Sequence, residues 1–103
     1  MRVKRGYAMD GKITKEMIQD FERALLVIED EKECDAFLQD VFTATEIEQF
    51  AQRLRAAKLL LEGQTYAQII AKTDISSATL SRVSNCVRRG SGGYKSVLEK
   101  LNK

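Results

Sequence analysis

The stretch TYAQIIAKTDISSATLSRVSNCVRR, residues 65–89, decides the fold because it reads as a short helix, a tight turn and a longer helix. Thr65 and Gln68 have the spacing of a capping box at the start of the first helix. The run TDIS interrupts that helix near Asp74, and Ser76 is suited to cap the second helix, which continues to about Arg89. Residues 65–89 are therefore predicted to form a helix-turn-helix.

The second of these helices has two different faces. Leu80, Val83 and Val87 recur at i, i+3 and i+7, so they are expected to face the core. The opposite face carries small and polar side chains, and a slim helix can enter the major groove of DNA, which is about 12 Å wide. The predicted DNA-binding residues are Gln68, Lys72, Ser76, Ser77, Ala78, Thr79, Ser81, Arg82, Asn85, Arg88 and Arg89.

Different residues of this set are expected to contact different parts of the DNA. The methyl, hydroxyl, amide and guanidinium groups between Ala78 and Asn85 suit base edges, whereas Arg88 and Arg89 at the helix end suit phosphates. Gln68 and Lys72 are expected to reach the DNA backbone. Each feature also has an ordinary structural explanation, since Ser and Thr cap helices and arginines near a C-terminus complement the helix dipole.

Charge is distributed unevenly along the chain. Residues 1–50 hold seven Lys/Arg and twelve Asp/Glu, a net charge of −5, whereas residues 51–103 hold ten and three, a net charge of +7. Such an asymmetry points to a polyanionic partner for the second half. The alternative is that the acidic half packs against the basic half, within one subunit or between two.

The rest of the chain also has helical periodicity, and no strand pattern is convincing. Thr14 is expected to cap a helix that runs to about Glu29, and Asp30 a second helix. Their inward residues are predicted to be Met17, Phe21, Leu25 and Ile28 in the first and Phe37, Leu38 and Val41 in the second.

A long helix is predicted between the capping box TATE, residues 43–46, and Gly63. Its apolar stripe consists of Ile47, Phe50, Leu54, Ala57 and Leu61. The run GSGG, residues 90–93, forms a break, and a last helix with apolar Val97, Leu98 and Leu101 follows from about Tyr94. We therefore expect an all-α fold of about six helices.

Composition excludes several classes of protein. The chain has 103 residues, 44% of them hydrophobic, and contains no His, Trp or Pro. No apolar run approaches the roughly 20 residues of a membrane span, and residues 1–12 are basic without the apolar core of a signal peptide. We expect a cytoplasmic protein with a flexible lead over residues 1–12, with no metal site and no catalytic constellation. Cys34 and Cys86 are expected to be buried free thiols.

A family resemblance is carried by FTATE, by the Arg-x-Arg of QRLRAAKLLLEG, by TYAQI and by SSATLSRVSNC with a following Tyr. In this order and spacing the chain resembles the Trp repressor family, and more closely its YerC/YecD-like branch, over roughly residues 30–101. The resemblance implies an all-α, intertwined homodimer in which N-terminal helices interlock and the helix-turn-helix meets DNA. Within one domain over residues 13–103, residues 13–62 would form the dimer, 65–89 the helix-turn-helix and 94–102 the C-terminal helix.

The resemblance also implies an effector pocket, because the Trp repressor binds tryptophan between two arginines and near a threonine. The matching positions are Arg53, Arg82 and Thr43. Val83 stands where the repressor has Gly, and its branched side chain would crowd an indole-sized pocket. We therefore expect no cofactor, with tryptophan or another small effector as the less favoured alternative, and expect Arg53 and Arg55 to contact phosphates or acidic residues.

The leading functional hypothesis is a homodimeric, sequence-specific regulator of transcription that binds double-stranded DNA, most simply as a repressor. Two alternatives remain open. One is a helical protein-interaction module with a vestigial helix-turn-helix, and the other is a replication-initiator-like DNA-binding domain. Catalysis is not expected, since GSGG lacks the preceding strand and the following Lys-Ser/Thr of a phosphate-binding loop.

Overall fold

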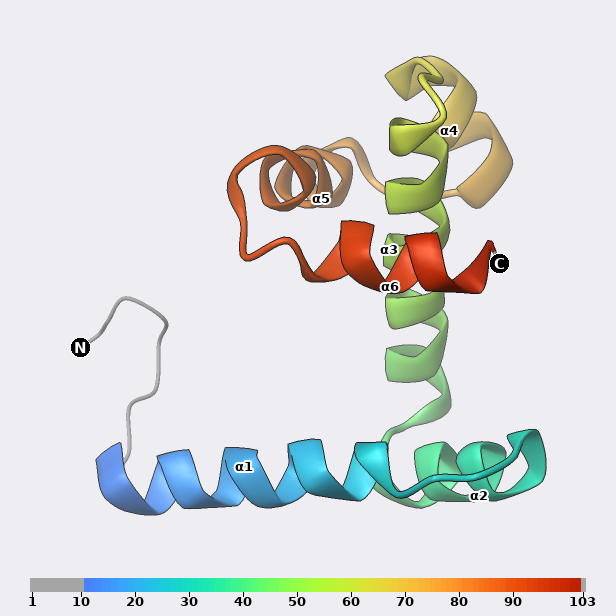
Figure 1. The fold of residues 1–103 in the computed structure, drawn as a ribbon. Helices are drawn as coiled ribbons and strands as arrows, with labels where there is room; N and C mark the ends of the chain where they lie inside the picture. Colours follow the sequence, from blue (N-terminus) through green and yellow to red (C-terminus); the bar gives the residue numbers. More distant parts are fainter. Residues whose placement is uncertain (1–10, 103) are drawn as a thin grey trace. The chain divides into compact units, whose positions relative to one another are not determined.

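The computed structural model describes residues 11–102, which form six helices and contain no strand. Helices α1 (Gly11–Leu26) and α2 (Glu31–Val41) belong to a first unit that ends at Val41 (Figure 1). The second unit begins at Phe42 and contains α3 (Ala44–Leu61), α4 (Tyr66–Thr73), α5 (Ser77–Arg89) and α6 (Gly93–Leu101). The prediction of an all-α fold with six helices is confirmed.

The first unit differs from the sequence prediction at the start of α1. Thr14 does not cap this helix, because α1 already includes Gly11 and Ile13. Ile13 lies one turn before Met17, so the apolar periodicity begins before the expected cap. The Thr14 hydroxyl is buried inside α1 without a hydrogen-bond partner. The predicted cap of α2 is confirmed, since the Asp30 carboxylate accepts from the backbone N–H of Glu33 at 2.8 Å.

The first unit has little interior of its own. The rings of Phe21 in α1 and Phe37 in α2 stack with their centroids 6.1 Å apart. Among the residues of 11–41 whose side chains are described, none is fully buried. Three residues predicted to face inward, Met17, Leu25 and Val41, are largely exposed, because the two short helices alone do not provide enough surface to cover them.

In the second unit, the helices α3 and α4 begin at the capping residues that the sequence predicts. Thr43 and Glu46 form a complete capping box, with bonds of 3.1 and 2.9 Å, at the start of α3. Helix α3 ends at Leu61, two residues before Gly63, whose φ of 86° suits glycine. The bonds from Gly63 N–H to the Leu60 carbonyl and from Gln64 N–H to the Leu59 carbonyl close a Schellman motif. Thr65 and Gln68 form the second capping box, at the start of α4.

The core of the second unit lies where α3 contacts α4, α5 and α6 (Figure 1). Its fully buried side chains come from all four helices and from the α4–α5 turn: Ala56, Ala57, Leu59, Ile69, Ile75, Leu80, Val83 and Leu98. Leu60, Ile70, Val87 and Tyr94 pack against this cluster. The predicted inward face of α5 is therefore confirmed.

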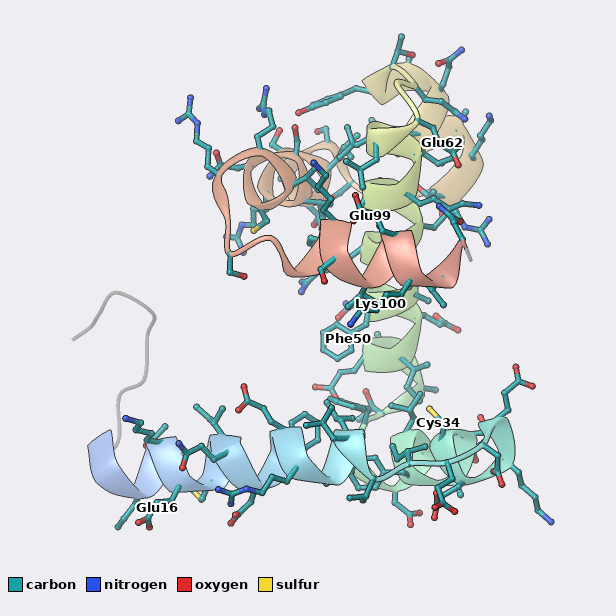
Figure 2. The ribbon with its side chains drawn as sticks, in the orientation of Figure 1. Glu16, Cys34, Phe50, Glu62, Glu99 and Lys100 are labelled. Atoms are coloured by element: carbon teal, nitrogen blue, oxygen red, sulfur yellow. The ribbon has the colours of Figure 1, made fainter. Side chains whose placement is uncertain are left out.

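The predicted apolar stripe of α3 is only partly the face that enters this core. Ala57 is buried, but Phe50, Leu54 and Leu61 are exposed. Ala56 and Leu59 are buried in their place. The small side chains of Ala56 and Ala57 let the other helices approach closely, so α3 carries one packed face and a second apolar face that its own unit leaves open. Figure 2 shows the Phe50 ring beside α3 and clear of the ribbon.

The connection between α5 and α6 relies on glycine at two positions, because Gly92 adopts a φ of 88° and Gly90 lies against backbone atoms. Gly90 follows α5 directly, and its N–H donates to the carbonyl of Cys86 at 2.9 Å. A Cβ atom at Gly90 would lie 2.5 Å from that carbonyl oxygen, which is backbone and cannot rotate away. Helix α6 then places Leu98 in the core. Val97 and Leu101, the other two apolar residues noted in the sequence of this helix, remain exposed.

Candidate nucleic-acid interface

The turn between α4 and α5 consists of three residues, Asp74 to Ser76. Asp74 has a φ of 61° and is the only non-glycine residue of 11–102 in the left-handed region, which aspartate tolerates better than most residues. Ile75 is buried, and the Ser76 hydroxyl caps α5 by accepting from the N–H of Thr79 at 3.1 Å. The predicted break at Asp74 and the predicted cap at Ser76 are both confirmed, so residues 65–89 form a helix, a turn and a helix.

The face of α5 opposite the core is exposed and made of small or hydrogen-bonding side chains. The exposed residues are Ser77, Ala78, Ser81, Arg82, Asn85, Arg88 and Arg89, and Thr79 is half-buried. On α4, both Gln68 and Lys72 are exposed. The structure thus places ten of the eleven predicted residues, Ser76 included, on the accessible surface of the helix-turn-helix.

Several of these side chains already have partners. The Ser76 hydroxyl donates to the Thr79 hydroxyl at 2.9 Å, so both hydroxyls belong to the cap of α5. The Gln68 side-chain oxygen accepts from the N–H of Thr65 at 2.9 Å, which leaves its NH₂ group available. The Lys72 ammonium donates to the side-chain oxygen of Gln64 at 2.8 Å. Any contact of these four groups with a ligand would use their remaining hydrogen-bonding capacity.

The arginines of α5 are not neutralised by nearby carboxylates. Within residues 11–102 the ion pairs link Arg23 with Asp20 and Lys58 with Glu62, and none involves α5. Two further arginines, Arg53 and Arg55, lie on α3 in the same unit. Unpaired guanidinium groups on an exposed helix give a surface that attracts phosphates.

The predicted effector residues are not gathered around one described cavity. Arg53 lines a polar hollow of about 300 Å³ together with Gln49, Gln52, Asp74, Ile75, Ser76 and Thr79. Thr43 is occupied as the N-cap of α3, and Arg82 is exposed. Val83 is buried in the core, where its branched side chain packs beneath α5.

Arg53 also lies against an aromatic ring. Its guanidinium lies 5.6 Å from the centroid of the Phe50 ring, and Phe50 meets Phe42 edge to face at 5.2 Å. Burial raises the pKa of Tyr94, the Cys86 thiol beside it raises that pKa further, and Arg53 opposes the rise. Cys86 itself is exposed and Cys34 is half-buried, so the expectation of two buried thiols is wrong, although both are free.

One polar residue of this region, Gln52, was not predicted from the sequence. Its side-chain NH₂ donates to the backbone carbonyl of Thr73, the last residue of α4, at 3.2 Å. A glutamine within a helix resembles any solvated residue in the sequence, and only its position opposite a helix end distinguishes it. The helical phase of α3, which places residue 52 beside the buried Ala56, is the one signal that could have indicated it.

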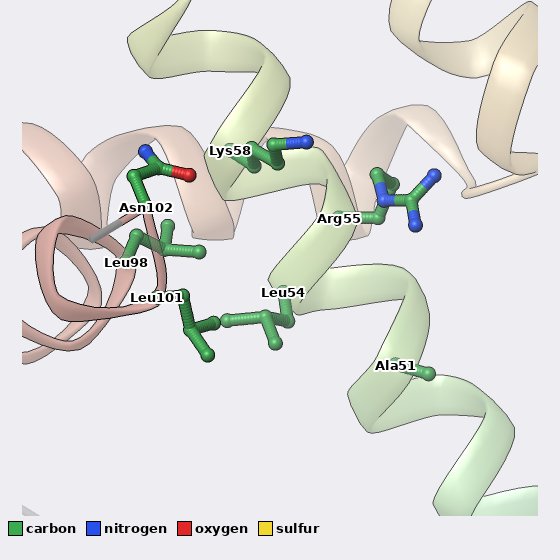
Figure 3. Close-up of a pocket in the computed structure, with 7 residues that line it drawn as sticks. All are labelled: Ala51, Leu54, Arg55, Lys58, Leu98, Leu101 and Asn102. Carbon is green, nitrogen blue, oxygen red and sulfur yellow. The ribbon is translucent and has the colours of Figure 1, made fainter.

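A second hollow, of about 390 Å³, lies between α3 and α6 (Figure 3). Leu54 of α3 and Leu101 of α6 point toward one another across it, whereas the guanidinium of Arg55 points away from α6. Its lining residues are Ala51, Leu54, Arg55, Lys58, Leu98, Leu101 and Asn102. The hollow thus combines an apolar floor with a basic rim on the open face of α3.

The family model described as Trp repressor protein matches residues 16–102. The chain belongs to the Trp repressor family. Proteins of this family are regulators rather than enzymes, in agreement with the expectation of a non-catalytic protein.

Three relatives are similar to this chain, one by sequence and two by both sequence and fold. The uncharacterized protein YerC of Bacillus subtilis (strain 168) is 40% identical over 87 residues, which cover 84% of this chain and 83% of YerC. A crystal structure of a candidate Trp repressor from Staphylococcus aureus is 34% identical, with a TM-score of 0.81, over 84% of this chain and 87% of that one. A TrpR-like protein from Eubacterium eligens ATCC 27750 is 36% identical, with a TM-score of 0.83, over 90% of this chain and 96% of that chain. These matches confirm the resemblance to the YerC-like branch.

Between residues 11 and 102, no helix combines the length and the apolar character that crossing a bilayer requires. The same residues contain no group of three or more Cys, Asp or Glu side chains arranged to hold a metal ion.

Proposed function

We propose that the protein is a sequence-specific DNA-binding regulator of transcription that acts through residues 65–89. The observation that carries this proposal is the exposed face of α5, where small side chains precede unpaired arginines. Ala78, Ser81, Arg82 and Asn85 would read base edges in the major groove, and Arg88 and Arg89 would hold phosphates. Ser76, Ser77 and Thr79 at the start of α5, and Gln68 and Lys72 on α4, would contact the DNA backbone.

We further propose that two copies assemble through residues 13–62. The first unit has no fully buried described residue, and α3 and α6 leave Phe50, Leu54, Leu61, Val97 and Leu101 exposed. Exposed apolar surface of this extent is expected at an interface between proteins. A homodimer would cover these side chains and set two copies of α5 about 34 Å apart, one turn of DNA.

Selection of bound duplexes from a random pool tests the proposal directly. A dimer with two reading helices should enrich a palindromic sequence whose half-sites are about one helical turn apart. Light scattering in solution should give twice the mass of one chain. Enrichment of no sequence at low salt would contradict DNA reading, and a single half-site bound by a monomer would contradict the dimer.

Substitutions on α5 separate reading from anchoring. Replacing Ser81 and Arg82 with Ala should lower the ratio of affinities for the selected and a scrambled duplex by about tenfold or more, since each good base contact contributes about 1–3 kcal/mol. Replacing Arg88 and Arg89 with Ala should weaken binding to both duplexes equally. It should also reduce the slope of log K against log salt by about 1.8, or about 0.9 for each lost phosphate contact.

The matched control is Lys95→Ala, which removes an exposed cation from α6, outside both residues 65–89 and residues 13–62. It should change neither the ratio nor the slope. If both pairs of substitutions on α5 lowered the ratio equally, the division between reading and anchoring residues would be wrong.

A further inference from the structure

The angle at which α5 is presented depends on how the α4–α5 turn is held against α3. The turn is only three residues long, and Asp74 within it adopts the left-handed conformation. A change of a few degrees at this turn would move the whole outer face of α5. Contacts that fix the turn therefore affect base reading without touching DNA.

Thr73 is the centre of the hydrogen bonds around this turn. Its hydroxyl donates to the carbonyl of Ile69 at 2.8 Å and accepts from the N–H of Ile75 at 3.3 Å. The N–H of Asp74 donates to the carbonyl of Ile70 at 2.9 Å. These bonds set the internal geometry of the turn, but all of them lie within α4 and the turn.

Gln52 supplies the link to α3. The carbonyl of Thr73 lies at the end of α4, where backbone carbonyls have no partner within the helix. A carbonyl only accepts, so the NH₂ group of Gln52 faces it, at 3.2 Å in a half-buried position. Among the side-chain hydrogen bonds described for residues 43–102, this is the one that joins α3 to the end of α4, directly before the turn.

Gln52 lies between two hollows in the surface of the second unit. Gln52 lines the polar hollow of about 300 Å³ on one side and a more open hollow of about 390 Å³ on the other. The second hollow is also lined by Glu48, Ala51, Arg55, Lys72 and Thr73. Of the three residues of the turn, Ile75 is buried in the core, whereas Asp74 and Ser76 are exposed. The Gln52 bond therefore adds a directional contact beside the packing of Ile75.

We infer that Gln52 is a positioning residue for DNA reading: its hydrogen bond to the Thr73 carbonyl fixes α5 relative to α3. This inference rests on the proposed function, because α5 must read DNA for its angle to matter. It predicts that loss of the donor changes discrimination between sequences more than it changes overall affinity or folding.

The test compares Gln52→Met and Gln52→Glu with the intact full-length chain. Methionine has a similar length but no donor, and a carboxylate cannot donate to a carbonyl. Gln49→Met is the matched control, because Gln49 lies on the same helix and lines the same polar hollow without bonding the turn. For each protein, affinities for the selected and the scrambled duplex, urea unfolding and amide exchange at residues 74–79 are measured.

Gln52→Met and Gln52→Glu should each lower the affinity ratio by about five- to tenfold, the effect of one typical hydrogen bond. Amide exchange at residues 74–79 should become faster, whereas Gln49→Met should change neither quantity. An unchanged ratio would overturn the inference. A uniform loss of affinity at constant ratio would also overturn it, because Gln52 would then be a direct contact to the DNA backbone.

Failure of the proposed function would give a different result. If the intact chain bound no duplex selectively, the ratio of affinities would be about one for every variant and could not test the inference. Amide exchange at residues 74–79 could still be compared between the variants. Faster exchange in Gln52→Met than in Gln49→Met would then sustain the positioning role. Equal exchange in the two variants would reject it.

Discussion

The two units of this chain differ in how far they bury their apolar side chains. Residues 42–102 enclose a core in which Ile69 and Leu80 are completely buried, whereas the described side chains of residues 11–41 include none that is fully buried. Both regions are helical and amphipathic, so amphipathicity alone does not indicate what will cover a face. The second unit closes on itself because α4, α5 and α6 each return to α3, and two helices cannot do the same.

The largest expected effect comes from breaking the core of the second unit. Leu80→Ala should lower the free energy of unfolding by about 2–5 kcal/mol, through lost burial and the cavity left behind. Leu26→Ala in α1 is the matched change in the first unit. Because Leu26 is 83% exposed in a single chain, this substitution should change the free energy of unfolding of the monomer by no more than about 0.5 kcal/mol. Urea unfolding measures both, and similar losses from the two would erase the contrast between the units.

A charge on the first unit should have a smaller effect that depends on protein concentration. If a second copy covers α1, Leu25→Glu should weaken dimerisation by about 2–3 kcal/mol, roughly the value of burying one leucine. Sedimentation over a range of concentrations measures the change. Gln19→Glu adds the same charge at an exposed polar position of α1 and should leave the dimer intact. A monomeric intact chain, or equal effects from the two substitutions, would show that α1 is not covered in this way.

The smallest expected effect concerns Tyr94 and alkaline pH. Because the pKa of Tyr94 is raised in the folded chain, chiefly by burial, the unfolded chain loses this proton first as pH rises. Stability should therefore be unaffected below the ordinary tyrosine range and should fall as pH rises through it. Tyr94→Phe should remove this part of the decline, with Tyr66→Phe as a control for a lost hydroxyl. A pH dependence of unfolding identical to that of the intact chain would contradict the assignment.

The sequence was most informative where a signal is local. Thr43, Thr65 and Ser76 could be recognised as caps because a cap needs only a side-chain oxygen and an N–H three residues away. The inward face of α5 was also predictable, since Leu80 and Val83 lie on a helix with a single apolar stripe. For Thr14 the same rule failed, because an apolar position precedes it in the same helix.

Properties that depend on the other helices could not be predicted. α3 offers more apolar residues than one face can hold, and periodicity does not say whether Ala56 or Leu54 will meet α5 and α6. The exposure of Cys86 and the bond from Gln52 to Thr73 likewise depend on where another helix ends. Of the candidate site, the exposed face of α5 was predictable from spacing, whereas the groups that hold it in place were not.

Gly90 has a practical consequence for protein engineering. Its missing side chain is required by the carbonyl oxygen of Cys86, whereas a Cβ atom at Gly93 would meet nothing closer than 3.8 Å. A reporter peptide or fluorophore site added after Ser91 should therefore be tolerated, but replacement of Gly90 should not. The short segment between α5 and α6 thus offers an attachment point for following the protein in cells, provided that Gly90 and Gly92, whose φ is 88°, are both retained.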